Sequence, residues 1–287
     1  AEVMNQYLYP AGPAARNGSS IVIDPAMAGW SYCGLEVLEM TPGESRVIAT
    51  GSNEVAVIPL SGSCTVDVES NHFAVDGRDG VFSGIAGFAY VPIDTEMRIT
   101  APSGGEIALC SAVATRRIDP YVVPAKAVSV EVRGAGTASR QVNNFLNAVS
   151  WEADKLIAVE VLTPEGGFSS YPAHKHDEMS EVEVELEEIY YFRIQGEHGS
   201  GFFACYTMDG EIDETVTVHS GDAFLVPKGF HGPAAAFPGH HMYYLNVMAG
   251  PSPERKWSIC NDPRQEPAME SLMAQGPDPR LPLTSAD

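Results

Sequence analysis

Long apolar runs and basic charge are both scarce in this sequence. No stretch approaches the roughly 20 apolar residues that a membrane-spanning helix needs, and the N-terminal residues AEVMNQYLYPAG lack the basic start and apolar run of a signal peptide. Only 17 lysines and arginines stand against 38 aspartates and glutamates, a formal net charge of -21. Such a field repels nucleic acid and anionic membranes, so we expect neither as a partner, and an anionic substrate needs local positive groups.

Cysteine pairs are also lacking. The cysteines are odd in number, widely scattered and without a CxxC motif: Cys33, Cys64, Cys110, Cys205 and Cys260. In a chain of 287 residues this pattern indicates free, buried thiols in a reducing compartment and not a disulfide scaffold. We therefore expect a cytoplasmic protein.

A long segment with the 3.6-residue period of a helix is missing as well. Short alternating segments, bounded by Gly, Pro, Asp and Ser, recur instead, for example EVAVIPLSG (54–62), EIALCSAVA (106–114), KLIAVEVLT (155–163) and EEIYYFRIQ (187–195). Strands of this length and spacing predict an all-β protein built as a barrel or sandwich.

The two halves of the chain look like distant copies of one unit. Each contains an apolar strand that ends in Val-Pro, GFAYVPIDT (87–95) and GDAFLVPKGFH (221–231). We predict two tandem barrels: an N-terminal barrel without metal (1–131), a polar connector (132–150), a metal-binding barrel (151–260) and an extended C-terminal arm (261–287). An arm of this kind often packs on a neighbouring subunit, which favours a homo-oligomer.

The strongest chemical signal is the segment YPAHKHDE (171–178). His174 and His176 are two residues apart, so on a strand both imidazoles face the same side and can bind one ion. Glu187 and Glu188 offer a carboxylate on the next strand, and His231 follows later in VPKGFH. Alternation favours Glu188, because Phe192 then faces the barrel interior.

The order of these residues is typical of a cupin, a small jelly-roll barrel (double-stranded β-helix) that holds one metal in its mouth. Gly167, Gly221, Pro227 and Gly229 match the turns of that pattern. Two departures exist: the acidic stretch DEMSEVEVELE lengthens the spacing from His176 to the carboxylate, and the turn before His231 is one residue short. The acidic stretch is either a charged loop or a lid over the mouth.

Three imidazoles and one carboxylate suit a divalent metal, with Zn²⁺ as the first choice and Mn²⁺, Fe²⁺ or Ni²⁺ as alternatives. The competing interpretation is that His174 and His176 merely line a polar strand. The N-terminal half contains a single histidine, His72, so we expect its interior to be filled by apolar side chains.

Several longer segments resemble one enzyme family. HKHDE, LEEIYYFRI, GFFACYTMDGEIDET, GDAFLVPKGFH and MYYLNVMAGP occur in the order seen in the 5-deoxy-glucuronate isomerases of bacterial inositol catabolism. EVAVIPLSGSCTVDV, GRDGVFSG and AYVPIDTEMRITA resemble that family's first cupin half, and DPRLPL resembles its tail. The family is related to ketol-isomerases that act on a deoxy-hexosulose uronate.

The resemblance implies an aldose–ketose isomerase that converts 5-deoxy-D-glucuronate to 2-deoxy-5-keto-D-gluconate. It implies that His174, His176, Glu188 and His231 bind the metal. A proton must then move between adjacent carbons, and Tyr190 and Tyr244 are the candidate catalytic side chains. Barrel packing is the competing interpretation of each tyrosine.

The substrate of such an enzyme is a small sugar acid, whose carboxylate needs a cation. Lys175 and Arg193 are near the site in sequence, but alternation points both outward, so Lys228 beside His231 is an alternative. Asn246 is a further substrate-binding candidate, although it could equally satisfy backbone groups. Two rival functions remain open at this point: a cupin dioxygenase that uses Fe²⁺ at the same ligands, and a sugar-acid-binding cupin without enzymatic activity.

Overall fold

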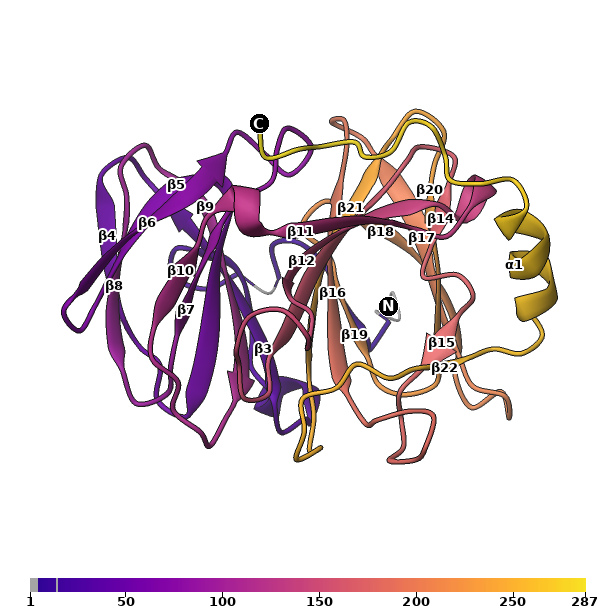
Figure 1. The fold of residues 1–287 in the computed structure, drawn as a ribbon, viewed down its shortest axis with the longest axis horizontal. Coiled ribbons are helices and arrows are strands. Elements are labelled where there is room, and N and C mark those ends of the chain that lie inside the picture. Colours follow the sequence, from indigo (N-terminus) through magenta and orange to yellow (C-terminus); the bar gives the residue numbers. More distant parts are fainter. Residues whose placement is uncertain (1–4, 14) are drawn as a thin grey trace.

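Two β-barrels lie side by side in the computed structural model, which describes residues 5–13 and 15–287 (Figure 1). Almost all regular structure is strand, which confirms the predicted all-β, double-cupin fold class. No helix in the described part of the chain is long and apolar enough to cross a membrane.

The first barrel is built around one long strand, β5, which pairs with neighbours at both of its ends. Its strands are β2 (Ser19–Ile23), β3 (Cys33–Met40), β4 (Glu44–Ala49), β5 (Asn53–Val68), β6 (Asn71–Arg78), β7 (Phe88–Val91), β8 (Glu96–Ala101), β9 (Gly105–Val113) and β10 (Tyr121–Val123). They are joined in the order β10-β7-β5-β9-β3-β2, with β6, β8 and β4 added at the far end of β5. Apolar side chains such as Val57, Val66 and Ile99 fill the interior.

The second barrel consists of two facing sheets. Its strands are β11 (Ser129–Arg133), β12 (Arg140–Leu146), β13 (Ile157–Thr163), β14 (Phe168–Ser169), β15 (His174–Lys175), β16 (Glu187–Ile194), β17 (Ser200–Tyr206), β18 (Asp213–His219), β19 (Ala223–Val226), β20 (Phe230–Ala236), β21 (Met242–Ala249) and β22 (Cys260–Asn261). One sheet has the order β1-β19-β16-β21-β13-β12-β11, where β1 is Leu8–Tyr9. The other has the order β18-β17-β20-β15-β22, with β14 beside β20.

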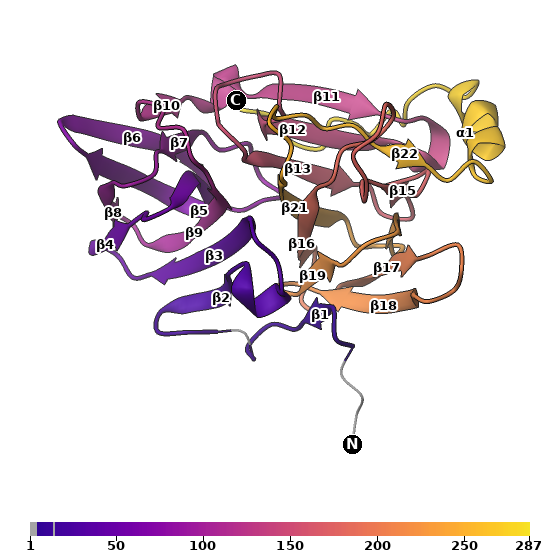
Figure 2. The same cartoon turned by 90° about the horizontal axis from the view of Figure 1, so that it is seen from below.

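The central strands of the larger sheet of the second barrel are buried on both faces. Alternate residues of β16 enter different cores: Ile189 and Tyr191 pack between the barrels, whereas Tyr190 and Phe192 pack inside the second barrel. Figure 2 shows β16 and β21 between β3 of the first barrel and β17 and β18 of the second. This explains why β21 reads as a continuous apolar run and not as an alternating one.

Three segments of the chain do not follow the domain boundaries expected from the sequence: the predicted connector and the two terminal segments. The segment 132–150, expected as a connector, contains β12, which pairs with β13. Its polar residues Gln141 and Asn143 are fully buried, where they hydrogen-bond each other and, in the case of Asn143, Glu160. The polar composition therefore reflects a buried network and not a solvent-exposed loop.

The chain termini also cross the expected boundaries. β1, near the N-terminus, pairs with β19 of the second barrel. The C-terminal segment forms helix α1 (Glu266–Met273) and then returns across the molecule to the first barrel (Figure 1). There Ile85 N donates to Ser285 O at 3.1 Å. Short 3-10 helices lie at Ala26–Ala28, Ala125–Ala127 and Gly136–Ala138.

Candidate metal centre

The candidate ligands come from both sheets of the second barrel. His174 lies on β15 and His176 follows its end, while His231 lies on β20, paired with β15 so that His231 is opposite His174. Glu188 lies on β16 in the facing sheet. The barrel therefore brings residues that are far apart in the sequence to one place in its interior.

The alternation of β16 decides which glutamate faces this interior. Glu188 is buried in the same phase as Tyr190 inside the second barrel. Glu187 faces the first barrel, where its carboxylate accepts hydrogen bonds from the backbone N–H groups of Tyr32 at 2.8 Å and Cys33 at 2.9 Å. The inward position of Glu188 agrees with the phase expected from the sequence.

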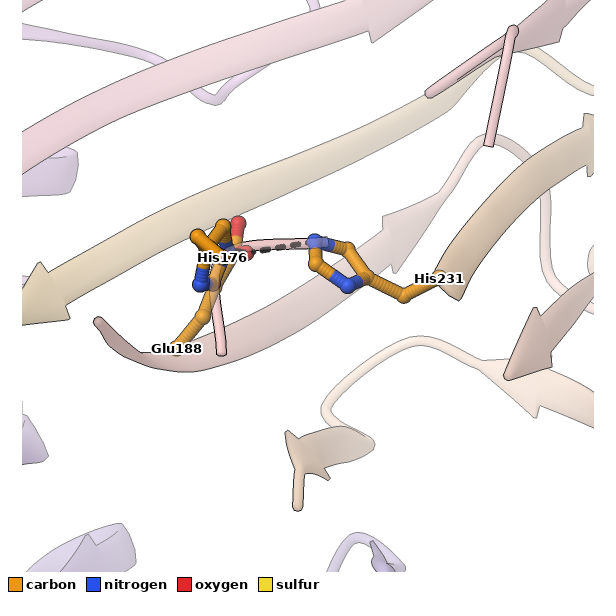
Figure 3. Close-up of side chains that lie close together, drawn as sticks. All are labelled: His176, Glu188 and His231. Atoms are coloured by element: carbon orange, nitrogen blue, oxygen red, sulfur yellow. Dashed lines mark hydrogen bonds and ion pairs between the residues drawn. The ribbon is translucent and has the colours of Figure 1, made fainter. Parts of the chain in front are cut away.

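His176, Glu188 and His231 each offer a ligand atom, and these atoms lie within 4.8 Å of one another. The Nε2 atoms of His176 and His231 lie 2.7 and 2.9 Å from Glu188 Oε2. Figure 3 shows the imidazole of His231 reaching toward Glu188 beside His176. The three side chains are 2%, 2% and 0% exposed, in the order His176, Glu188, His231, so the cluster is shielded from bulk water.

The tautomers of the two imidazoles indicate a cation at this cluster. Nδ1 of His176 lies 2.8 Å from Leu186 O, and Nδ1 of His231 lies 3.2 Å from Gly229 O. Because a carbonyl oxygen only accepts hydrogen bonds, each Nδ1 carries a proton, and in the neutral imidazole that metal binding requires each Nε2 presents a lone pair. Two lone pairs then face one carboxylate oxygen, and Nε2 of His231 lacks a hydrogen-bond partner among the described residues. A metal ion relieves this repulsion, and metal-bound histidines typically hold their other nitrogen in this way.

The electrostatics of the cluster favour an anionic Glu188 and a neutral His174. His176 differs, because burial would lower its pKa but the hydrogen bond to Glu188 outweighs burial and raises that pKa. Burial alone would raise the pKa of Glu188, but the neighbouring imidazoles of His231 and His176 outweigh it and hold that pKa well below its usual range. Burial, together with His231, lowers the pKa of His174 to about 3. Glu188 is therefore anionic and His174 neutral at physiological pH, as required of metal ligands.

His174 lies beside the three-residue cluster without belonging to it. Its ring centroid is 4.5 Å from that of His231 and 6.4 Å from that of His176. Its Nδ1 lies 3.2 Å from Pro172 O, so its Nε2 is also free to bind a metal. As the fourth ligand, His174 stays a prediction.

The acidic stretch after His176 forms a loop that leaves the site and returns to it. Leu186 N donates to His176 O at 3.0 Å, which closes the loop at its base. Within it, Glu183 is buried and pairs with Lys175, and its other carboxylate oxygen accepts from Asp177 N at 2.8 Å. The unusual spacing between His176 and Glu188 is therefore absorbed by a closed loop, and Glu188 still reaches the histidines.

The cations proposed from the sequence for the substrate carboxylate all have acidic partners. Lys175 pairs with Glu183, Arg193 pairs with Glu106 of the first barrel, and Lys228 lies 2.8 Å from Glu211 at the surface. Arg193 lies on the face of β16 that packs between the barrels. Neither Arg193 nor Lys228 lines the cavity beside the histidines, so their positions give the substrate-binding prediction no support.

The predicted tyrosines meet at one serine inside the second barrel. The hydroxyls of Tyr190 and Tyr244 each lie 3.0 Å from Ser170 Oγ, and that of Tyr244 also donates to Ser169 Oγ at 2.9 Å. Burial raises the pKa of both tyrosines. They are neutral at physiological pH, so either can donate a proton but neither can act as a base.

A cavity of about 370 Å³ opens beside His174. Its lining includes Arg140, Tyr171, Trp257 and Asn261, and its size is in the range of small-molecule sites. A larger cavity of about 580 Å³, around Tyr121, contains none of the candidate metal ligands. The sequence analysis did not identify Arg140, because this residue lies in the segment interpreted as a connector. Had β12 been recognised as a strand, alternation would have placed Arg140 on the same face as the inward-facing Val142.

Comparison with known proteins identifies the family. Residues 7–268 match the model of the KduI/IolB family. The chain is 39% identical over 274 residues to the 5-deoxy-glucuronate isomerase of Geobacillus thermodenitrificans, covering 94% of this chain and 98% of that protein. It is 34% identical over 266 residues to the protein of that name from Bacillus subtilis strain 168, covering 91% and 97%.

Solved structures agree with these matches. An IolB-like protein from Salmonella typhimurium superposes with a TM-score of 0.85 at 36% identity, covering 90% of this chain and 97% of that one. Oxalate decarboxylase from Lactobacillus farciminis superposes with a TM-score of 0.63 at 12% identity, covering 97% and 98%, which shows a shared fold alone. Taken with the curated relatives, these matches make the protein an enzyme of the isomerase class, and the chain belongs to the KduI/IolB family.

Proposed function

We propose that this chain is a metal-dependent aldose–ketose isomerase that converts 5-deoxy-D-glucuronate to 2-deoxy-5-keto-D-gluconate in myo-inositol catabolism. The observation that carries the proposal is the buried cluster in which the Nε2 atoms of His176 and His231 face one oxygen of Glu188. Relatives named 5-deoxy-glucuronate isomerase, matched over nearly their whole length, support the choice of substrate.

In this proposal His174, His176, Glu188 and His231 bind one divalent ion, with Zn²⁺ as the first choice and Mn²⁺, Fe²⁺ or Ni²⁺ as alternatives. The ion supplies Lewis-acid polarisation of the substrate carbonyl and its neighbouring hydroxyl. The protein fixes the three imidazoles through their Nδ1–H groups, which donate to the backbone carbonyls of Pro172, Leu186 and Gly229. Substrate enters through the cavity beside His174.

Tyr190 is the proposed proton donor and Tyr244 a positioning residue. The ring of Tyr190 packs edge-on to His231 at a centroid distance of 5.9 Å, which places it next to the cluster. Tyr244 holds Ser170, which in turn lies within hydrogen-bond distance of the Tyr190 hydroxyl. Asn246 is buried, and its Nδ2 has no hydrogen-bond partner among the described residues, so it is proposed to donate to a substrate hydroxyl.

Replacing each tyrosine by phenylalanine separates these roles. Tyr190→Phe is expected to lower kcat by about 100-fold, the usual contribution of a general acid. Tyr244→Phe removes a hydroxyl that contacts only serines, so kcat is expected to fall by less than about tenfold and stability by about 1 kcal/mol. Steady-state kinetics and urea unfolding measure both. Equal, small effects on kcat would make Tyr190 a packing residue.

Metal removal tests the proposed function directly. After treatment with a chelator, turnover of 5-deoxy-D-glucuronate is expected to vanish, and adding back individual divalent ions is expected to restore it. The metal-loaded protein should also unfold at a higher temperature, because a ligand that binds only the folded state stabilises it. If no divalent ion restores turnover in a protein that was active as isolated, metal dependence is wrong.

Location and assembly are the remaining parts of the proposal. All five cysteines are free in the structure, which supports the cytoplasm as the compartment. The C-terminal segment packs along its own chain, so it gives no support to the homo-oligomer expected from the sequence. That expectation stays a prediction, which light scattering of the purified protein decides.

A further inference from the structure

Arg140 lines the cavity beside His174, and one hydrogen-bonding edge of its guanidinium has no partner among the described residues. The residue begins β12, and its Nη1 donates to Ala138 O at 3.0 Å and to Tyr171 O at 3.2 Å. These two bonds fix the guanidinium plane. Nε and Nη2 donate to no group in the described part of the chain, and together they form the edge that holds a carboxylate through two parallel hydrogen bonds.

The missing partner is unusual in so acidic a protein. The chain carries 38 aspartates and glutamates against 17 lysines and arginines, yet no carboxylate of the described residues lies within 4.0 Å of Arg140. Arg133, which also lines the cavity, differs: it pairs with Glu131 at 2.5 Å and its guanidinium lies 5.0 Å from the ring centre of Trp257. Burial lowers the pKa of Arg140, as expected of a cation removed from water without a counter-charge.

The cavity connects this cation to the candidate metal centre. Arg140 and His174 line the same space of about 370 Å³, and His174 is adjacent to His231 of the cluster. Tyr171, Trp257 and Asn261 complete a wall with both apolar surface and hydrogen-bonding groups. A ligand in this cavity can therefore contact Arg140 with an anionic end and His174 with its other end.

We propose that Arg140 binds the carboxylate of the sugar-acid substrate and thereby selects acids over neutral sugars. The inference rests on the proposed function, because it assigns the anionic end of that substrate. Since a protein of net charge -21 repels anions at long range, this contact supplies local attraction. The C1 aldehyde then lies toward the histidine cluster and the C6 carboxylate toward β12.

The test compares 5-deoxy-D-glucuronate with its neutral C6 alcohol, 5-deoxy-D-glucose, in the metal-loaded protein. Arg140→Gln is expected to lower kcat/KM for the acid by about 100-fold or more, as expected when one partner of a desolvated ion pair is lost. For the alcohol, kcat/KM should change by less than about threefold, since no charge pair is lost. Arg140→Lys keeps the charge without the two-pronged edge and should lose roughly tenfold on the acid.

Two controls separate this contact from general effects of charge and folding. Lys228→Ala removes an exposed cation that already pairs with Glu211, so kcat/KM for the acid should stay within about twofold of the wild type. Metal content and melting temperature show whether each variant is folded. Arg140→Gln keeps an amide donor for the carbonyls of Ala138 or Tyr171, which protects the fold better than alanine.

The outcomes distinguish this inference from the proposed function. If the wild type turns over the acid and Arg140→Gln keeps the same preference for acid over alcohol, Arg140 is not the carboxylate site, and the isomerase proposal stands. If the wild type turns over neither compound with any divalent ion, the proposed function fails. Calorimetry with D-glucuronate then decides the binding site: weaker binding by Arg140→Gln supports the inference, and unchanged or absent binding overturns it.

Discussion

Replacing Glu188 by glutamine is expected to lower turnover of the proposed substrate, 5-deoxy-D-glucuronate, on the order of 1,000-fold, because a metal bound as proposed would stabilise the transition state by several kcal/mol. The substitution keeps the size of the side chain but removes the anionic oxygen that both Nε2 atoms face at 2.7 and 2.9 Å. Bound metal should fall with activity. Elemental analysis of the purified variant, alongside steady-state kinetics, measures both.

Glu187→Gln is the matched control for this experiment. Glu187 is adjacent in sequence but faces the first barrel, where it accepts hydrogen bonds from the backbone of Ser31, Tyr32 and Cys33. Its replacement should reduce stability by about 1–2 kcal/mol while leaving the metal content unchanged. A Glu188→Gln protein with full metal content and nearly full turnover would contradict the assignment of the centre.

The position of Glu188 inside the second barrel could be predicted from the sequence because it depends on local periodicity. Alternation along β16 placed Glu188 and Tyr190 on the same face, and the order of His176, Glu188 and His231 matched a known barrel pattern. The long spacing between His176 and Glu188 departs from that pattern. The structure shows that Leu186 returns to His176 through a backbone hydrogen bond. This could not be predicted, because the alternation of residues along a strand says nothing about the path of a loop.

The surroundings of the site depend on long-range contacts and could not be predicted in this way. Gln141 and Asn143 made β12 look like a solvent-exposed connector, although their amides are buried by residues distant in sequence, Glu160 and Thr284. For the same reason the sequence predicted Lys228 as a cation for the substrate carboxylate and did not single out Arg140. The structure distinguishes them: Lys228 pairs with Glu211, whereas Arg140 pairs with no carboxylate among residues 5–13 and 15–287.

Of the substitutions considered, breaking the buried ion pair between the barrels is expected to cause the largest decrease in the free energy of unfolding. Arg78 of β6 and Glu160 of β13 form two hydrogen bonds of 2.8 Å, and their side chains are 1% and 0% exposed. Arg78→Ala leaves Glu160 charged and buried, and among the described residues Tyr243 and Asn143 are its remaining hydrogen-bond donors. The free energy of unfolding should fall by about 3–5 kcal/mol, as measured by urea denaturation.

A double variant and a surface control test whether this loss comes from the unpaired charge. Arg78→Met combined with Glu160→Met removes both charges. The free energy of unfolding should therefore fall by less than the sum of the decreases measured for Arg78→Met and Glu160→Met alone. Arg116→Ala breaks an ion pair to Glu152 whose side chains are 55% and 61% exposed, and should cost at most about 1 kcal/mol. If Arg78→Ala lowers the free energy of unfolding as little as Arg116→Ala does, water or neighbouring groups must compensate the charge of Glu160. The apolar core around Ile189 and Leu245 would then hold the barrels together without the ion pair.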